Sequence, residues 1–77
     1  MVERKKPVDG AIGRRIKDLR VARGMSRLQL ARKIGITQRM VTYYEQGWVR
    51  MNIERLTQFA IALRCQLVDL ITPPEAP

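Results

Sequence analysis

The sequence contains no histidine and a single cysteine, Cys65, among its 77 residues. Histidine is the commonest general base and metal ligand in proteins, so its absence removes the usual means of acid–base catalysis and metal binding. A lone cysteine excludes an internal disulfide and any site that needs two thiolates. The carboxylates are scattered and no glycine-rich phosphate loop is present. These absences predict that the chain is not an enzyme and carries no metal or cofactor.

Long apolar runs are also missing. No stretch approaches the roughly 18 apolar residues that cross a bilayer, and the first ten residues lack the apolar core of a signal peptide. With one cysteine, this predicts a cytoplasmic protein in a reducing compartment. The length predicts one domain at 9–72. A basic, flexible arm at 1–8 precedes it, and a short proline-rich tail at 73–77 follows it.

Positive charge is the strongest global signal. Fifteen lysines and arginines against seven acidic residues give a net charge of +8. Such an excess indicates a polyanionic partner, either nucleic acid or an anionic membrane surface. The arginines are spread over several predicted helices instead of forming one amphipathic stripe, which disfavours the membrane. Nucleic acid is therefore the preferred partner.

Apolar spacing and helix-end signals predict an all-α fold, a compact bundle of five short helices. Ile12, Ile16 and Leu19 recur at helical spacing from Asp9 onward, and Gly24 follows as a helix stop. Further helices are expected after the caps Ser26 (with Gln29), Thr37 and Asn52, and at Leu67–Ile71. Ile53, Leu56, Phe59, Ala60 and Leu63 form the expected apolar face of the fourth. The three-residue link "GIT" favours a steep helix-turn-helix crossing at about 26–46.

The predicted third helix is short and mainly polar. Val41 and Tyr44 are placed to pack on the body of the domain. Gln38 can bind adenine and Arg39 can bind guanine, each through two hydrogen bonds that discriminate by about 1–3 kcal/mol. Tyr43 has a ring suited to a thymine methyl and a hydroxyl suited to phosphate. The alternative is that these three side chains form a solvated helix face.

From Ile12 to Ile71 the chain resembles the helix-turn-helix family of phage repressors and Cro proteins, also called the XRE family. The matching segments are "IGRRIKDLR", "RGMSRLQLARKIGIT", "VTYYEQG" and "LTQFAIAL". The resemblance implies a lambda-repressor-like fold whose second motif helix enters the major groove of DNA. It also implies that Gln38, Arg39 and Tyr43 contact bases.

The resemblance further implies contacts to DNA phosphates. The family usually has a glutamine that touches phosphate and braces the recognition helix where this chain has Arg27. An arginine still clamps phosphate, but a bracing bond to Gln38 is put in doubt. Trp48 is unusual at its position, with packing over the loop or in a subunit interface as the alternative. The implied phosphate contacts are Arg27, Thr37, Gln46, Trp48 and Arg50.

Arg20 and Glu45 match a pair that family members bury as a salt bridge. This assigns them to architecture, the alternative being two independent surface charges. Arg64 stands where a glycine in a left-handed turn is common, which predicts a reshaped corner after the fourth helix. Leu28 replaces a usual charge. Cys65 occupies an apolar position and is assigned to the core.

The predicted function is a sequence-specific, double-stranded DNA-binding transcriptional regulator. Repression by a homodimer on a palindromic operator is implied by the family. The candidate dimer residues are the apolar groups left after the core is filled, namely Trp48, Val49, Met51, Leu67, Val68 and Ile71. One alternative is a DNA-binding antitoxin or restriction–modification controller with a protein partner such as a toxin. Another is a protein-interaction module with this fold and no DNA binding.

Overall fold

A computed structural model describes residues 7–71. They form α1 (Pro7–Ala22), α2 (Arg27–Ile34), α3 (Gln38–Gln46), α4 (Ile53–Leu63) and α5 (Leu67–Ile71). No strand occurs in this range, which confirms the predicted all-α fold. Helix α1 begins at Pro7, two residues before Asp9, the start that the sequence pattern predicts. Most of the predicted arm and tail lies outside the described residues.

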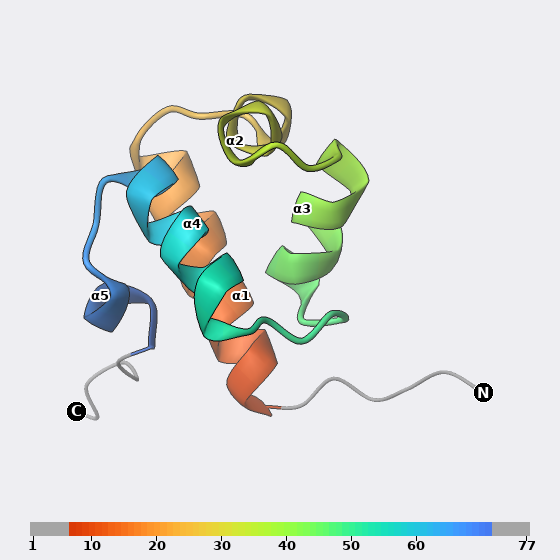
Figure 1. Cartoon of the computed structure of the whole chain (residues 1–77), viewed down its shortest axis with the longest axis vertical. Coiled ribbons are helices and arrows are strands. Elements are labelled where there is room, and N and C mark those ends of the chain that lie inside the picture. Colours follow the sequence, from red (N-terminus) through yellow and green to blue (C-terminus); the bar gives the residue numbers. More distant parts are fainter. Residues whose placement is uncertain (1–6, 72–77) are drawn as a thin grey trace.

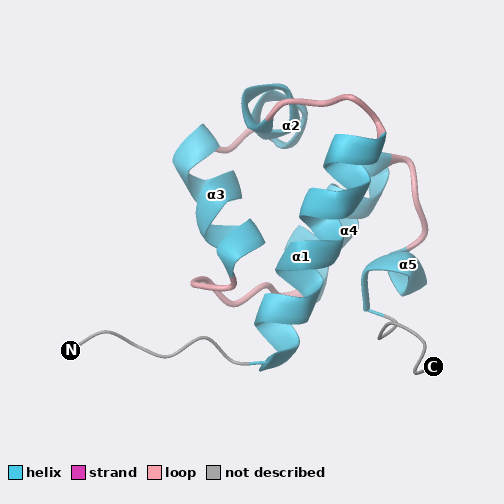
Figure 2. Ribbon diagram, turned by 180° about the vertical axis from the view of Figure 1, so that it is seen from behind, coloured by secondary structure: helices cyan, strands magenta, loops and turns pink. Residues whose placement is uncertain are grey.

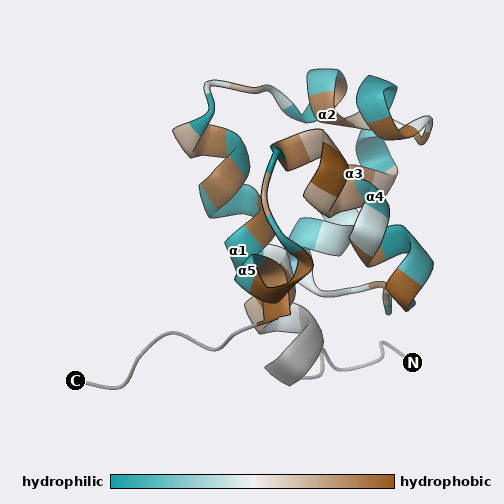
Figure 3. Cartoon of the chain, turned by 60° about the vertical axis from the view of Figure 1, so that its left-hand side comes forward, coloured by the Kyte–Doolittle hydropathy of each residue, from teal (hydrophilic) through white to brown (hydrophobic). Residues whose placement is uncertain are grey.

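Helices α1 and α4 form the centre of the molecule. They lie side by side, with α3 and α5 on opposite sides of the pair and α2 across one end (Figures 1 and 2). Bands of hydrophobic and hydrophilic residues alternate along the helices, as expected for amphipathic elements around one core (Figure 3). None of the helices in residues 7–71 is both long and apolar enough to cross a membrane.

The helix ends follow the predicted local signals. Ser26 and Gln29 form a capping box: the Gln29 N–H donates to Ser26 Oγ (3.0 Å), and the Ser26 N–H donates to Gln29 Oε1 (2.8 Å). Thr37 and Asn52 are the N-caps of α3 and α4, and each side chain accepts one backbone N–H of the first turn. Gly35 ends α2 in the left-handed conformation at φ 86°. Both helices of the motif are therefore fixed at their starts by their own sequence.

The corner between α4 and α5 differs from the prediction. Arg64 itself adopts the left-handed conformation, with φ 56° and ψ 48°, and is the only non-glycine residue of the described chain at positive φ. The turn keeps its closing bonds, from the Arg64 N–H to Ile61 O (3.2 Å) and from the Cys65 N–H to Ala60 O (3.0 Å). The predicted reshaping is therefore wrong, because these bonds outweigh a backbone cost of about 1–2 kcal/mol.

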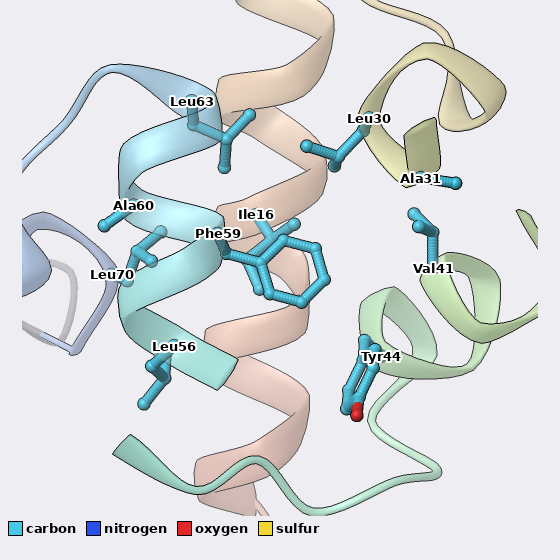
Figure 4. Close-up of a cluster of buried hydrophobic side chains, with 10 residues drawn as sticks. All are labelled: Ile16, Leu30, Ala31, Val41, Tyr44, Leu56, Phe59, Ala60, Leu63 and Leu70. Carbon is cyan, nitrogen blue, oxygen red and sulfur yellow. The ribbon is translucent and has the colours of Figure 1, made fainter. Parts of the chain in front are cut away.

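All five helices contribute to one hydrophobic core. Phe59 and Ile16 lie at its centre, and the Tyr44 ring meets Phe59 edge-on, with centroids 5.4 Å apart (Figure 4). Ile53, which the pattern placed on the apolar face of α4, is 64% exposed because it stands in the first turn, beyond the end of the core. The buried residues are Ile16, Leu30, Ala31, Val41, Tyr44, Leu56, Phe59, Ala60, Leu63 and Leu70.

Gly13 sets the distance between α1 and α3. It is buried, and a β-carbon at this position would overlap the carbonyl oxygen of Tyr44 and lie 2.5 Å from that of Glu45. Any larger residue would push the last turn of α3 away from α1. No local sequence signal marks this glycine, since the need for it arises only where two helices cross.

Candidate nucleic-acid interface

The two faces of α3 meet different surroundings. Val41 and Tyr44 are buried in the core, as predicted, and fix the helix to the domain. Gln38 and Arg39 are exposed, and Tyr43 is 38% exposed. Within residues 7–71, the side chains of these three make no hydrogen bond or ion pair. The structure thus presents all three predicted base-contact residues to solvent on one short helix.

The motif crosses steeply, as its short link predicts. Figure 1 shows α2 nearly end-on at the top, while α3 runs down the right-hand side in the plane of the view. The five predicted phosphate-contact residues lie at the ends of α2 and α3 or in the loop after α3. Arg27 begins α2 and Thr37 caps α3. Gln46 is the last residue of α3, and the exposed Trp48 and Arg50 follow in the loop before α4.

Glu45 holds two arginines at once. Arg20 Nε donates to Glu45 Oε2 (2.6 Å) and Arg20 Nη2 donates to Oε1 (3.3 Å), forming the buried salt bridge that the resemblance implies. Arg20 Nη1 also donates to the carbonyl of Met25 (2.8 Å). Arg27 Nε donates to Glu45 Oε1 (2.9 Å), a contact that no feature of the sequence pattern predicted. Arg27 therefore braces α3 through Glu45, where a bond to Gln38 was in question.

Two hollows lie near the motif, each away from the predicted base-contact residues. One hollow of about 240 Å³ lies at the start of α4, beside Arg50 and Arg55. A larger one of about 880 Å³ lies between α1 and the end of α3. Neither is lined by Gln38, Arg39 or Tyr43. A helix with one exposed polar face suits the major groove of DNA, which is wide enough to admit a helix.

Arg55 is a basic residue that the sequence pattern did not mark as a DNA contact. Its guanidinium carbon lies 5.8 Å from the centroid of the Tyr44 ring, and Nη1 donates to Gln58 Oε1 (2.9 Å). These contacts hold a positive charge at the start of α4, close to Arg50. The only sequence signal was its place in the first turn of a capped helix.

The six candidate dimer residues fall into two groups. Trp48, Val49 and Met51 lie between α3 and α4, whereas the others belong to α5, which lies across the α1–α4 pair from α3 (Figure 2). Val49, Met51 and Leu67 are partly buried against the protein's own core. The remaining three are about half exposed, namely Trp48, Val68 and Ile71.

Leu28 and Cys65 are two further residues to which the family resemblance drew attention. Leu28, which replaces a usual charge, is 41% exposed on α2. Cys65 is half-buried and packs against the core. Burial raises the pKa of the Cys65 thiol; Asp69 adds to the rise and Arg23 opposes it. The thiol is therefore less ionised than an exposed one.

In the described part of the chain, no group of three or more cysteine, aspartate or glutamate side chains is arranged to hold a metal.

A family model described as Helix-turn-helix, HTH_3, matches residues 16–70. An uncharacterized HTH-type transcriptional regulator of Rickettsia conorii is 41% identical over 56 residues, which are 73% of this chain and 45% of that protein. Another, from Sinorhizobium fredii, is 38% identical over 65 residues, or 82% of this chain and 46% of that protein. The chain thus spans less than half the length of these curated relatives.

Solved structures share the fold. The restriction-modification controller protein C.AhdI from Aeromonas hydrophila has a TM-score of 0.76 at 28% identity, covering 79% of this chain and 92% of that one. The P22 c2 repressor, solved with a synthetic operator, has a TM-score of 0.73 at 23% identity with the same coverage, a likeness in fold alone. The matched family and relatives are transcriptional regulators, in agreement with the prediction that the chain is not an enzyme.

Proposed function

Because this chain belongs to the HTH_3 helix-turn-helix family, we propose that it binds double-stranded DNA sequence-specifically and regulates transcription as a repressor. The observation that carries the proposal is the face of α3 formed by Gln38, Arg39 and Tyr43. It is exposed, although the opposite face of the same helix is buried. Two of these side chains have the donor and acceptor geometry that reads adenine and guanine.

The residues proposed to contact phosphates lie at the helix ends of the motif and in the loop after it. Arg27 and Thr37 stand at the helix starts, where backbone N–H groups also favour an anion. Gln46 is the last residue of α3, and Trp48 and Arg50 follow it in the loop before α4. Phosphate contacts of this kind fix the orientation of the protein on the duplex, while base contacts specify the sequence.

We further propose a homodimer on a palindromic operator. One recognition helix reads only a few base pairs, so useful specificity needs two copies. Trp48, Val68 and Ile71 are the more exposed of the candidate interface residues. A second candidate function is that of a restriction–modification controller, which the similarity to C.AhdI favours because it covers 92% of that protein.

Selection of bound sequences from a random DNA pool tests the proposal. The expected result is enrichment of a palindrome whose half-sites are centred about 10 base pairs apart, one helical turn. Sedimentation at high micromolar concentration, with and without that DNA, tests the dimer. Failure to enrich any sequence would reject specific DNA binding, and a monomer in both conditions would reject the dimer.

A further inference from the structure

We propose that Glu45 is a positioning residue for DNA binding, and that it acts by holding Arg27 in the orientation that clamps a backbone phosphate. This inference rests on the proposed function and assigns Glu45 a role beyond the buried salt bridge. Its basis is the bond from Arg27 Nε to Glu45 Oε1, 2.9 Å long, between the first residue of α2 and the end of α3.

The geometry leaves the outer end of Arg27 available. A guanidinium carries five N–H donors, of which Nε supplies one. With Nε bound to Glu45, the remaining four belong to Nη1 and Nη2, which make no bond to another described residue. The Arg27 side chain is 36% exposed while that of Glu45 is 1% exposed. The arginine therefore has its Nε anchored to the buried carboxylate while its side chain stays partly exposed to solvent.

The anchor itself is fixed. Arg20 binds both oxygens of Glu45 and also the carbonyl of Met25, so the carboxylate has little freedom to follow a moving partner. A side chain held in advance loses less conformational freedom on binding than one that must be ordered by the ligand. The planar fork of arginine also matches phosphate oxygens with two parallel hydrogen bonds, which a lysine cannot reproduce.

Charge alone makes the opposite prediction for one variant. Arg20, Arg27 and Glu45 together carry a net charge of +1, and Glu45→Gln raises it to +2. If only the local charge mattered, this substitution would strengthen DNA binding and steepen its salt dependence. If Glu45 positions Arg27, the same substitution weakens binding and flattens the salt dependence, because one phosphate contact per subunit is lost. The sign of the change therefore separates the two.

The experiment is a double-mutant cycle of Glu45→Gln and Arg27→Ala. Affinity is measured by fluorescence anisotropy on the duplex selected by the parent protein, between 50 and 200 mM salt. Measurements are made near 10 °C on protein shown by circular dichroism to be folded. Glu45→Gln should weaken binding by at least about 2- to 13-fold per subunit, because the cost of ordering one side chain adds to the lost phosphate contact. The salt slope should fall by about 0.9 per subunit. Neither change should appear in the Arg27→Ala background.

A matched control comes from the same helix. Arg32→Ala removes an equal charge from α2 without touching Glu45, so its effect should add to that of Glu45→Gln. Arg27→Lys serves as a second variant in case Glu45→Gln does not fold. It keeps the charge but lacks the fork, and should lose nearly as much affinity as Arg27→Ala.

The outcomes distinguish two failures. A parent protein that binds no duplex overturns the proposed function, and this inference falls with it. A parent that binds, with Glu45→Gln equal or tighter, overturns the inference alone. Equal effects of Glu45→Gln in both Arg27 backgrounds, or parental affinity in Arg27→Lys, would overturn it as well.

Discussion

Arg20 Nε lies 2.6 Å from Glu45 Oε2, and this bond ties the last turns of α1 and α3 together beneath the surface. The two side chains are 9% and 1% exposed. Buried charges are tolerated only when their hydrogen bonds are satisfied, and here no buried side-chain nitrogen or oxygen of the described residues lacks a partner. The pair therefore holds the exposed helix at a fixed place on the domain.

Substitutions in this cluster should destabilise the fold in a definite order. Glu45→Gln should lower the free energy of unfolding by about 3–5 kcal/mol, because Arg20 stays buried without its counter-charge. Arg20→Met should cost less, since Arg27 still pairs with Glu45. Arg27→Ala should cost less than about 1 kcal/mol, because its side chain is more than one-third exposed. Urea unfolding followed by circular dichroism gives the order; a Glu45→Gln midpoint equal to the parent's would contradict it.

Gly13→Ala should destabilise the protein by about 1–3 kcal/mol or more, the usual cost of overpacking. The added methyl group would lie 2.5 Å from the carbonyl oxygen of Glu45, in rigid backbone. Gly10→Ala is the matched control in the same helix, since its β-carbon meets nothing within 4 Å. It should stabilise the protein by about 0.5–1 kcal/mol. Thermal melts of both variants test this, and similar shifts for the two would show that α1 and α3 can separate freely.

Arg64→Gly should stabilise the protein by about 1 kcal/mol. The residue has φ 56°, which a side chain disfavours and glycine accepts. Arg64→Ala keeps the strained backbone and should stay within about 0.5 kcal/mol of the parent. If both variants melt alike, the left-handed backbone is not the source of the cost. Urea unfolding resolves a difference of this size.

Cys65 should react slowly with iodoacetamide at pH 8 compared with the same thiol in urea. Burial raises the pKa of Cys65, with Asp69 adding to the rise, and the thiolate is the reactive form. Because the pKa is higher in the folded state, the protonated thiol contributes to the free energy of unfolding. This contribution is complete below the ordinary thiol pKa of about 8.5 and is lost as the pH rises through the pKa of the folded protein. Asp69→Asn should shift the alkylation profile to lower pH. An unchanged profile would remove Asp69 as a cause.

Arg39→Ala should weaken binding to the selected operator by about 1–3 kcal/mol, with most of the loss confined to one base pair per half-site. The reason is that its exposed guanidinium can bind O6 and N7 of a guanine together. Gln38→Ala should relax discrimination at a neighbouring pair. Affinities against every single-base change in the operator measure both effects. An equal loss on all sequences with a lower salt slope would place Arg39 on phosphate.

The helices and their ends followed from the sequence because the signals are local. The capping box of Ser26 and Gln29, the cap Thr37 and the glycine stop Gly35 act within a few residues. The buried anchors of α3, Val41 and Tyr44, followed from helical spacing. Ile53 shows the limit of spacing, since it has the correct phase but lies beyond the end of the core.

Contacts between helices were decided by the tertiary structure. The resemblance implied that Arg20 meets Glu45, but nothing in the residue pattern showed that Arg27 shares the same carboxylate. Likewise, only the crossing of α1 on α3 shows why position 13 is glycine. Local sequence determines helix ends and faces because those depend on neighbours within one or two turns. The pairing of charges and backbones far apart in the chain depends on how the helices pack, and that packing places Arg27 against Glu45 of α3.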